Sequence, residues 1–204
     1  MQPLARGGPD PLIRKMPAPE PPEDLTGLSL AEVARMAAER RILPVQSWNP
    51  GHCGHSHMRI ARDGTWYHEG QPITRPTMIR LFSTILRREP DGRFVLVTPV
   101  EKLDIEVEDA PFVAVELKSE GSGRERSLAF RLNTGDLLIA DEAHRLRVTG
   151  TAEEARPYVS VRTGLDARID RPVYYELAEL ALEEASDPLG LWSHGTFFPL
   201  EAAE

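Results

Sequence analysis

Two stretches of the chain repeat one hydrophobic pattern, which predicts two similar helices. Each stretch begins with an isoleucine and an Arg-Pro pair, in Ile73–Pro76 and Ile169–Pro172. Thr74 and Asp170 are placed to act as N-caps, and a proline is tolerated in the first helical turn. A Gly-x-Phe strand start follows each stretch, so we expect a duplicated strand-and-helix unit, with the first helix ending near Arg88. Apolar residues recur at helical spacing, at Met78, Leu81, Phe82, Ile85 and Leu86 and again at Tyr174, Leu177, Ala178, Ala181 and Leu182.

Alternation of apolar and polar residues predicts strands in much of the remaining chain. The dipeptide Asp63-Gly64, typical of type I′ turns, joins residues 58–62 and 65–68 in a hairpin. Connections between the later strands are too short for helical crossovers, so antiparallel pairing is expected. A further helix is expected at Ser29–Arg41. The later strands are predicted at residues 94–98, 103–107, 112–117, 127–132, 137–140, 146–148 and 158–161.

These elements predict an α+β fold with a duplicated strand-and-helix core. Residues 1–27 place prolines between polar residues and are expected to form a disordered tail. Residues 28–98 are expected to form an N-terminal α+β half. Residues 99–204 are expected to form a C-terminal half, a bent antiparallel sheet or open barrel capped by a helix. The cleft between the halves is therefore the first place where a ligand is expected.

Composition and charge narrow the possible classes of protein. The 204 residues carry a net charge of −8, which argues against general nucleic-acid binding and against adsorption to anionic membranes. No segment reaches the roughly 20 apolar residues of a membrane-spanning helix. Met1–Met16 lacks the continuous apolar stretch of a signal peptide, and Cys53 is the single cysteine, so no intrachain disulfide can form. The sequence therefore predicts a cytoplasmic protein.

Several short motifs follow one another in a specific order. With them, residues 28–200 resemble the bacterial family called domain of unknown function 1285. The motifs are Cys53-Gly54, Met58-Arg59-Ile60-Ala61, Asp63-Gly64-Thr65-Trp66-Tyr67, Thr98-Pro99-Val100-Glu101-Lys102, Val107-Glu108-Asp109-Ala110-Pro111-Phe112 and Trp192-Ser193. The resemblance implies a duplicated core whose second half is similar to pleckstrin-homology folds. It also implies a site between the halves for a nucleotide-like molecule in signalling, and it brings no catalytic residues.

Arginines at the starts of the two predicted helices indicate an anion site. A cation in the first turn is unfavourable to the helix dipole, so another interaction should retain Arg75 and Arg171 there. First-turn amides and a guanidinium can together bind a phosphate or carboxylate, while a salt bridge is the alternative for either arginine. Glu101 and Lys102 lie at the expected junction of the halves, where Lys102 would supply a further cation. Ordinary solvation in a turn is the alternative for this pair.

Four further residues complete the predicted ligand-binding set. Trp66 is a candidate because an indole can stack on a nucleotide base, although such residues more often fill a core. Cys53, Arg59 and Ser193 are the others. The chain has no phosphate-binding glycine loop, dinucleotide fingerprint, kinase motif or nucleophile-elbow serine, so we assign no catalytic residue.

A glycine-rich loop at residues 51–57 holds four potential metal ligands, His52, Cys53, His55 and His57. Zinc favours such atoms, but structural zinc sites usually join two separated pairs of ligands. We therefore expect no metal and no cofactor. A Cys53 thiolate activated by the neighbouring histidines is the enzymatic alternative, and a buried structural cysteine is the commoner case.

Three functional hypotheses remain open at this point. The leading one is a regulatory or binding protein that holds a small anionic metabolite between two repeated halves. The second is a metal- or thiol-dependent enzyme centred on Cys53 and its histidines. The third is a protein–protein interaction module that acts through the sheet-rich half, and no motif identifies its protein partner.

Overall fold

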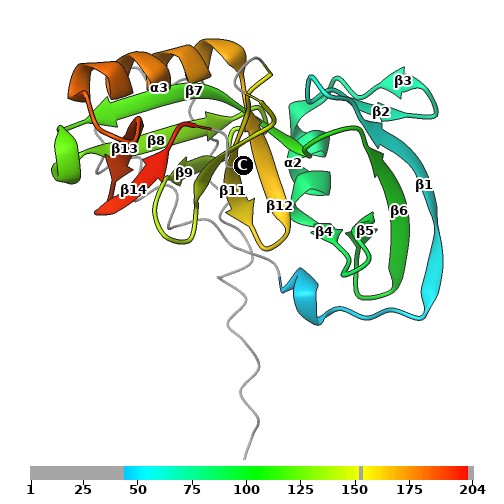
Figure 1. The fold of residues 1–204 in the computed structure, drawn as a ribbon. Coiled ribbons are helices and arrows are strands. Elements are labelled where there is room, and N and C mark those ends of the chain that lie inside the picture. The colour runs from blue at the N-terminus through cyan, green and yellow to red at the C-terminus, as the bar shows by residue number, and fades with distance from the viewer. Residues whose placement is uncertain (1–43, 152–153, 202–204) are drawn as a thin grey trace, which may run out of the picture.

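The structure, a computed structural model, describes residues 44–151 and 154–201. The predicted tail at residues 1–27 and the predicted helix at 29–41 lie outside these residues. In the described part of the chain, two six-stranded mixed sheets and two α-helices form two halves that lie beside each other (Figure 1). The fold is therefore mostly β, with less helix than the predicted α+β class. Neither of these helices is long and apolar enough to span a membrane.

The first sheet curves as a half-barrel around helix α2 (Figure 1). Its strand order is β3-β2-β1-β6-β5-β4, and α2 connects β3 to β4. A short 3-10 helix, η2 (Val45–Ser47), precedes the sheet. The elements are β1 (His52–Ile60), β2 (Trp66–His68), β3 (Gln71–Pro72), α2 (Pro76–Thr84), β4 (Leu86–Arg88), β5 (Phe94–Val97) and β6 (Glu101–Val107).

The second sheet has the strand order β10-β11-β12-β7-β8-β9 and is followed by helix α3. Helix α3 lies along β7, and a C-terminal hairpin packs beside them (Figure 1). The elements are β7 (Phe112–Glu120), η3 (Gly123–Glu125), β8 (Ser127–Leu132), β9 (Leu137–Ile139), β10 (Leu146–Thr149), β11 (Arg156–Arg162), β12 (Leu165–Ile169), α3 (Arg171–Glu184), β13 (Gly190–Ser193) and β14 (Thr196–Pro199).

The two halves repeat one sheet design. In each sheet, two antiparallel three-stranded meanders meet at a parallel pair, β1 with β6 in the first and β12 with β7 in the second. The expectation of purely antiparallel pairing is wrong at these two places. The parallel strands need no short crossover, because the rest of each sheet forms the connection between them. The helices hold different positions in the repeat, since α2 joins two meanders whereas α3 follows both.

Strand β6 belongs to the first sheet, although the predicted boundary at residues 98/99 assigns it to the C-terminal half. It pairs in parallel with β1 and antiparallel with β5. The N-terminal half therefore extends beyond the predicted boundary, because β6 pairs with β1, the first strand of the same sheet. The segment that connects the two sheets is 108–111.

Several local predictions are confirmed and others are corrected. The hairpin turned by Asp63-Gly64 and the seven later strands are present. Helix α2 has Arg75 rather than Thr74 as its N-cap, and it ends at Thr84 instead of near Arg88. The chain then enters β4, because Leu86 pairs with β5 and becomes fully buried. The predicted loop at residues 51–57 is mostly strand β1.

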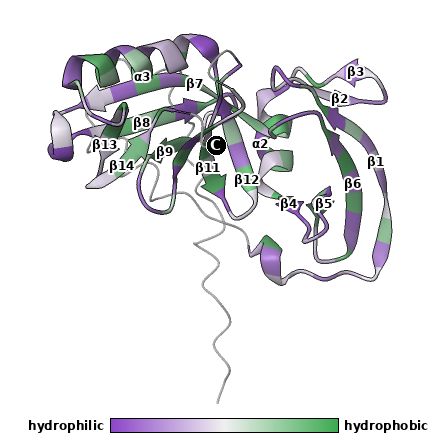
Figure 2. Ribbon diagram, viewed as in Figure 1, coloured by the Kyte–Doolittle hydropathy of each residue, from purple (hydrophilic) through white to green (hydrophobic). Residues whose placement is uncertain are grey.

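A large hydrophobic core runs through both halves, and a smaller cluster of Val45, Val95 and Val97 lies apart from it. Polar and hydrophobic residues alternate along β6, as Figure 2 shows, so that one side of the strand faces this core. Trp66 from the first sheet is fully buried and stacks on Phe82 of α2, with ring centroids 6.3 Å apart. Phe112 and Leu165 extend the same core into the second sheet. Burial of this shared apolar surface is the main force that holds the halves together.

Candidate functional site

The junction of the halves is fixed by hydrogen bonds that cross from one sheet to the other. The Asn133 side chain accepts a hydrogen bond from the Val113 amide at 3.0 Å. It also donates a hydrogen bond to the Gly64 carbonyl at 3.2 Å. Gly64 lies in the β1–β2 turn with a φ of +85°, and an added Cβ would lie 2.5 Å from the Asn133 side-chain nitrogen. The Tyr158 hydroxyl donates to Asp109 at 2.8 Å. The turn and the 108–111 segment are therefore held firmly against the second sheet.

Arg162 ties α2 to the second sheet. Its guanidinium donates to the Ser83 carbonyl near the C-terminal end of α2 and, at 3.2 Å, to the Leu86 carbonyl at the start of β4. Burial lowers the pKa of Arg162 from its usual value, which marks a desolvated cation. The Ser83 carbonyl is one that the end of a helix leaves without an intrahelical partner, so Arg162 caps α2 from the other half.

A row of polar side chains crosses β10, β11 and β12 on the face opposite the core. Arg147 pairs in register with Tyr158, which pairs with Arg168. Arg147 stacks over the Tyr158 ring at 4.6 Å and donates to Asp166 at 2.7 Å, so its charge is compensated. Burial, followed by the hydrogen bond to Asp109, raises the pKa of Tyr158 above its usual value.

Arg168 is the least satisfied cation of this row. Its Nε is buried and has no hydrogen-bond partner within the described part of the chain. Its one ion pair there is a long one, 3.6 Å from a terminal nitrogen to Asp170. The pKa of Asp63 is lowered mainly by hydrogen bonds from Thr65. The positive charge of Arg168 lowers it further to a smaller extent, so Asp63 lies near that guanidinium.

Helix α3 begins immediately beyond Arg168. Asp170 is the N-cap residue, but its side chain makes no capping hydrogen bond and extends toward Arg168 instead. The N-cap side chain accepts no hydrogen bond from the amides of the first turn, such as those of Arg171 and Val173, and Pro172 has no amide hydrogen to donate. The uncapped start of α3 therefore follows Arg168 closely in the chain, and Asp170 links the two. This combination of donors is suited to a carboxylate or phosphate.

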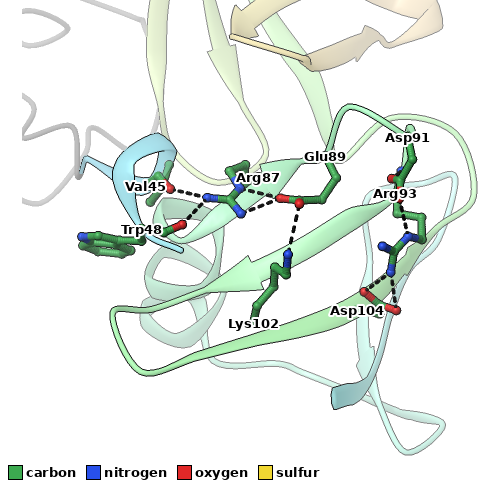
Figure 3. Close-up of polar contacts among 8 residues, drawn as sticks. All are labelled: Val45, Trp48, Arg87, Glu89, Asp91, Arg93, Lys102 and Asp104. Atoms are coloured by element: carbon green, nitrogen blue, oxygen red, sulfur yellow. Dashed lines mark hydrogen bonds and ion pairs between the residues drawn. The ribbon is translucent and has the colours of Figure 1, made fainter. Parts of the chain in front are cut away.

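The cations predicted from sequence do not form one site. Arg75 and Arg171 are exposed, and neither side chain makes an ion pair or hydrogen bond with the described residues. Lys102 is largely buried and donates to Glu89 at 3.2 Å (Figure 3). Its charge is compensated there, so Lys102 is a structural residue. Only Arg171, at the start of α3, lies beside the donors described above.

Glu89 and Arg87 explain why Lys102 is held in place. Arg87 donates to the carbonyls of Val45 and Trp48, each at 2.7 Å, and to Glu89, also at 2.7 Å. Figure 3 shows Arg87 of β4 and Lys102 of β6 converging on the Glu89 carboxylate. The network fastens the η2 segment to the first sheet. Burial alone would raise the pKa of Glu89, but the hydrogen bonds from its two cations outweigh this effect and hold the pKa below its usual value.

The other predicted ligand residues have structural partners. Glu101 is half-buried in the β5–β6 turn, where its amide donates to the Thr98 hydroxyl at 3.2 Å. Arg59 pairs with Glu108 and stacks over Tyr67. Trp66 is a core residue, which was the alternative to stacking on a base. Its indole N–H has no acceptor among the described residues. Ser193 is also fully buried: it accepts the Leu128 amide at 3.0 Å and donates to the Ala140 carbonyl at 2.6 Å.

Cys53 and its histidines lie on the exposed part of β1. Cys53 is exposed, so the structure contradicts a buried structural cysteine. The His57 amide donates to Nδ1 of His55 at 3.1 Å, which occupies the lone pair of that nitrogen and places the proton of a neutral ring on Nε2. A histidine that binds a metal through Nε2 instead carries its proton on Nδ1, so this contact opposes metal binding. The described residues contain no group of three or more potential ligands around one point.

The groove between α3 and β7 differs in character from the junction. It has a volume of about 260 Å³ and an apolar floor formed by Leu117 and Leu180. Three carboxylates on α3, from Glu176, Glu179 and Glu183, form its rim. An anionic ligand would be repelled from this groove, which leaves the junction as the better site for an anion.

Sequence reasoning missed Arg168. The residue lies in Leu165-Asp166-Ala167-Arg168-Ile169, an alternating segment that the sequence analysis did not assign to a strand. Recognition of β12 from this alternation would have placed Arg168 on the polar face of the second sheet. Its proximity to the start of α3 follows directly, because the helix begins two residues after β12 ends.

Comparison with known proteins places this architecture in a family. Residues 43–110 match the N-terminal domain, and residues 111–200 the C-terminal domain, of a family described as domain of unknown function (DUF1285). A crystal structure of a DUF1285 family protein from Silicibacter pomeroyi DSS-3 is 48% identical, with 84% of this chain and 95% of that chain covered and a TM-score of 0.72. One from Shewanella baltica OS155 is 25% identical, with 63% and 92% covered and a TM-score of 0.47. No curated protein matches the chain. The domain matches and the 48% identity show that this chain belongs to the DUF1285 family, as its sequence motifs predict.

Proposed function

We propose that this protein is a non-catalytic binding protein that holds a small carboxylate- or phosphate-bearing ligand at the junction of its halves. The observation that carries the proposal is the buried Nε of Arg168, which has no partner in the described part of the chain and lies beside the uncapped start of α3. A buried donor without an acceptor costs about 1–3 kcal/mol, and a bound anion would recover that free energy.

The charges around Arg168 limit the kind of ligand. Asp63 and Asp170 both lie near the guanidinium, so the site has no large excess of positive charge. Recognition therefore depends on hydrogen bonds from fixed donors rather than on long-range attraction. The side chain of Asp170 is 44% exposed and can turn toward solvent when an anion replaces it. A single carboxylate or phosphate group fits these conditions better than a polyanion.

The test compares two arginines of the same polar row. Arg168→Met removes the donor of the proposed site, and Arg147→Met removes a neighbouring cation that is already paired with Asp166. Binding of inorganic phosphate, acetate and nucleoside monophosphates to each protein would be followed by amide chemical shifts. We expect at least one of these probes to bind wild type and Arg147→Met with similar affinity. Arg168→Met should bind it about ten-fold or more weakly, the equivalent of losing a charge-assisted hydrogen bond.

Asp170→Asn provides a second, opposite test. The substitution removes the carboxylate that competes with the ligand for Arg168 while it preserves the shape of the side chain. We expect tighter binding of the same probe. Equal binding by all four proteins, or binding of no probe by wild type, would refute the site.

A role in signalling, a nucleotide-like ligand, the pleckstrin-homology resemblance of the second half and a cytoplasmic location remain parts of this proposal. The resemblance of the sequence motifs implies the first three, and the composition of the chain predicts the fourth. The enzymatic alternative has less support, because the exposed Cys53 makes no hydrogen bond to a histidine among the described residues.

A further inference from the structure

The groove between α3 and β7 leaves a margin of the main core accessible. Its floor residues, Leu117 and Leu180, pack against that core but are only half-buried. Its volume of about 260 Å³ is below the roughly 300–1,000 Å³ of most small-molecule sites. The groove therefore suits one or two apolar side chains of a peptide segment better than a separate small molecule.

The carboxylates on the rim of this groove lack cations. Glu176, Glu179 and Glu183 are exposed, and none of their side chains makes an ion pair or hydrogen bond with the described residues. They lie three and four residues apart on α3, so they repel one another along one face of the helix. Glu184, the next residue, is by contrast paired with Arg126 at 2.9 Å. Two cations beside the rim would relieve the repulsion that the described residues leave uncompensated.

The segment Leu12-Ile13-Arg14-Lys15-Met16, which lies outside the described residues, has the complementary chemistry. Three of its side chains are large and apolar, and two adjacent ones are cationic. It belongs to the proline-rich tail, which is predicted to form no core of its own, so contact with another surface is needed to bury these apolar groups. We propose that this segment binds in the α3–β7 groove of the same chain, with its apolar side chains on the floor and its cations beside the rim.

The length of the connecting chain permits this contact. Between Met16 and Pro44, the first described residue, lie 27 residues. They span roughly 90 Å at full extension and about 30 Å as a flexible coil, whereas a compact part of this size has a radius of gyration of about 15 Å. Tethering provides an effective concentration on the order of 1 mM, so a contact with a dissociation constant of about 1 mM would be half occupied. The net charge of −8 attracts this basic segment.

The experiment places a nitroxide spin label beside the segment in the full-length protein. Cys53→Ser removes the native thiol, and Ala18→Cys provides the attachment site. Paramagnetic broadening of backbone amide signals then reports which residues lie near the tail. We expect broadening at Leu117, Ser119 and Leu180, and we expect it to decrease as salt is added, because ions screen the attraction.

Charge reversal tests the pairing of the segment with the rim. The double substitutions Arg14→Glu with Lys15→Glu, and Glu179→Lys with Glu183→Lys, each replace attraction with repulsion. Either pair should reduce the broadening in the groove about five-fold or more. All four substitutions together restore opposite charges, so they should restore the broadening. A loss caused by misfolding would not be reversed in this way.

The matched control is Arg40→Glu with Arg41→Glu, which makes the same charge change at another basic pair before Pro44. It should leave the broadening unchanged. The proposal would be overturned by absence of broadening in the groove, by an equal loss in this control, or by failure of the four-fold variant to restore the signal. Broadening of an unlabelled, ¹⁵N-enriched chain mixed with spin-labelled protein would also overturn it, because the groove would then bind the tail of another copy.

Discussion

The buried Arg87 network makes a prediction that can be worked out quantitatively. Arg87→Met keeps the aliphatic length of a side chain that is 8% exposed, but it removes the donors to the Val45 and Trp48 carbonyls. It also leaves Glu89, 14% exposed, with Lys102 as its remaining cation. Removing one partner of a buried ion pair typically costs about 3–5 kcal/mol. For a chain of this size each kcal/mol lowers the melting temperature by about 2–4 °C, so we expect a decrease of roughly 6–20 °C.

The matched control is Arg93→Met, in the turn that precedes β5 (Figure 3). Arg93 also contacts two carboxylates, Asp91 and Asp104, but its side chain is 56% exposed. We expect its urea midpoint to match that of wild type within error. Both variants would be unfolded in urea and followed by circular dichroism. Equal losses in the two variants would refute the argument that burial gives the Arg87 network its strength. Adding Glu89→Leu to Arg87→Met should not restore the stability, because it removes the carboxylate that Lys102 contacts at 3.2 Å and leaves a largely buried ammonium without it.

Three further predictions concern stability. The lowered pKa of Glu89 means that its contribution is present at neutral pH and is lost as pH falls through and below its usual value of 4.5, so Glu89→Gln should flatten the acid side of a plot of urea midpoint against pH. Gly64→Ala should cost more than about 2 kcal/mol, because the new Cβ meets Asn133, whereas Gly70→Ala, at a similar φ in open space, should cost about 1 kcal/mol. Ser193→Ala should cost about 1–3 kcal/mol in urea unfolding and leave probe binding unchanged, because its hydroxyl serves two buried backbone groups.

Local signals in the sequence predicted local structure well. The Asp63-Gly64 turn and the alternation of Leu103-Asp104-Ile105-Glu106-Val107 each contain their own physical cause, so the hairpin and β6 were found in place. The Leu86–Arg88 segment was predicted as helix because its apolar spacing fits both a helix and a strand. Pairing with β5 decided the outcome, and that contact is not encoded within the segment itself.

The candidate site required information that a linear pattern does not contain. Lys102 and Arg168 both interrupt apolar strands, yet one meets Glu89 and the other has a buried donor without a partner. The difference depends on which strand lies alongside each residue. Lys102 lies opposite its acid because β4, β5 and β6 are neighbours, and no spacing rule predicts that order. Ser193, by contrast, was predicted as a ligand residue because it lies in a motif that carries the family resemblance. Its hydroxyl instead forms hydrogen bonds with two buried backbone groups.

The positions of the two helices in the duplicated design explain why one anion site is expected rather than two. Both helices start with an Arg-Pro pair, which made Arg75 and Arg171 appear equivalent in the sequence. Helix α2 starts from β3, an exposed two-residue strand at the margin of the first sheet. Helix α3 starts from β12, which has β11 on one side and β7 on the other. Helix α3 therefore begins three residues after Arg168, on the same central strand, where the uncapped helix start and a cation can serve one anion. Titration calorimetry with a probe that binds should therefore give one site per chain, and Arg75→Met should leave its affinity unchanged. Two equivalent sites, or weaker binding by Arg75→Met, would show instead that the repeat of sequence is also a repeat of function.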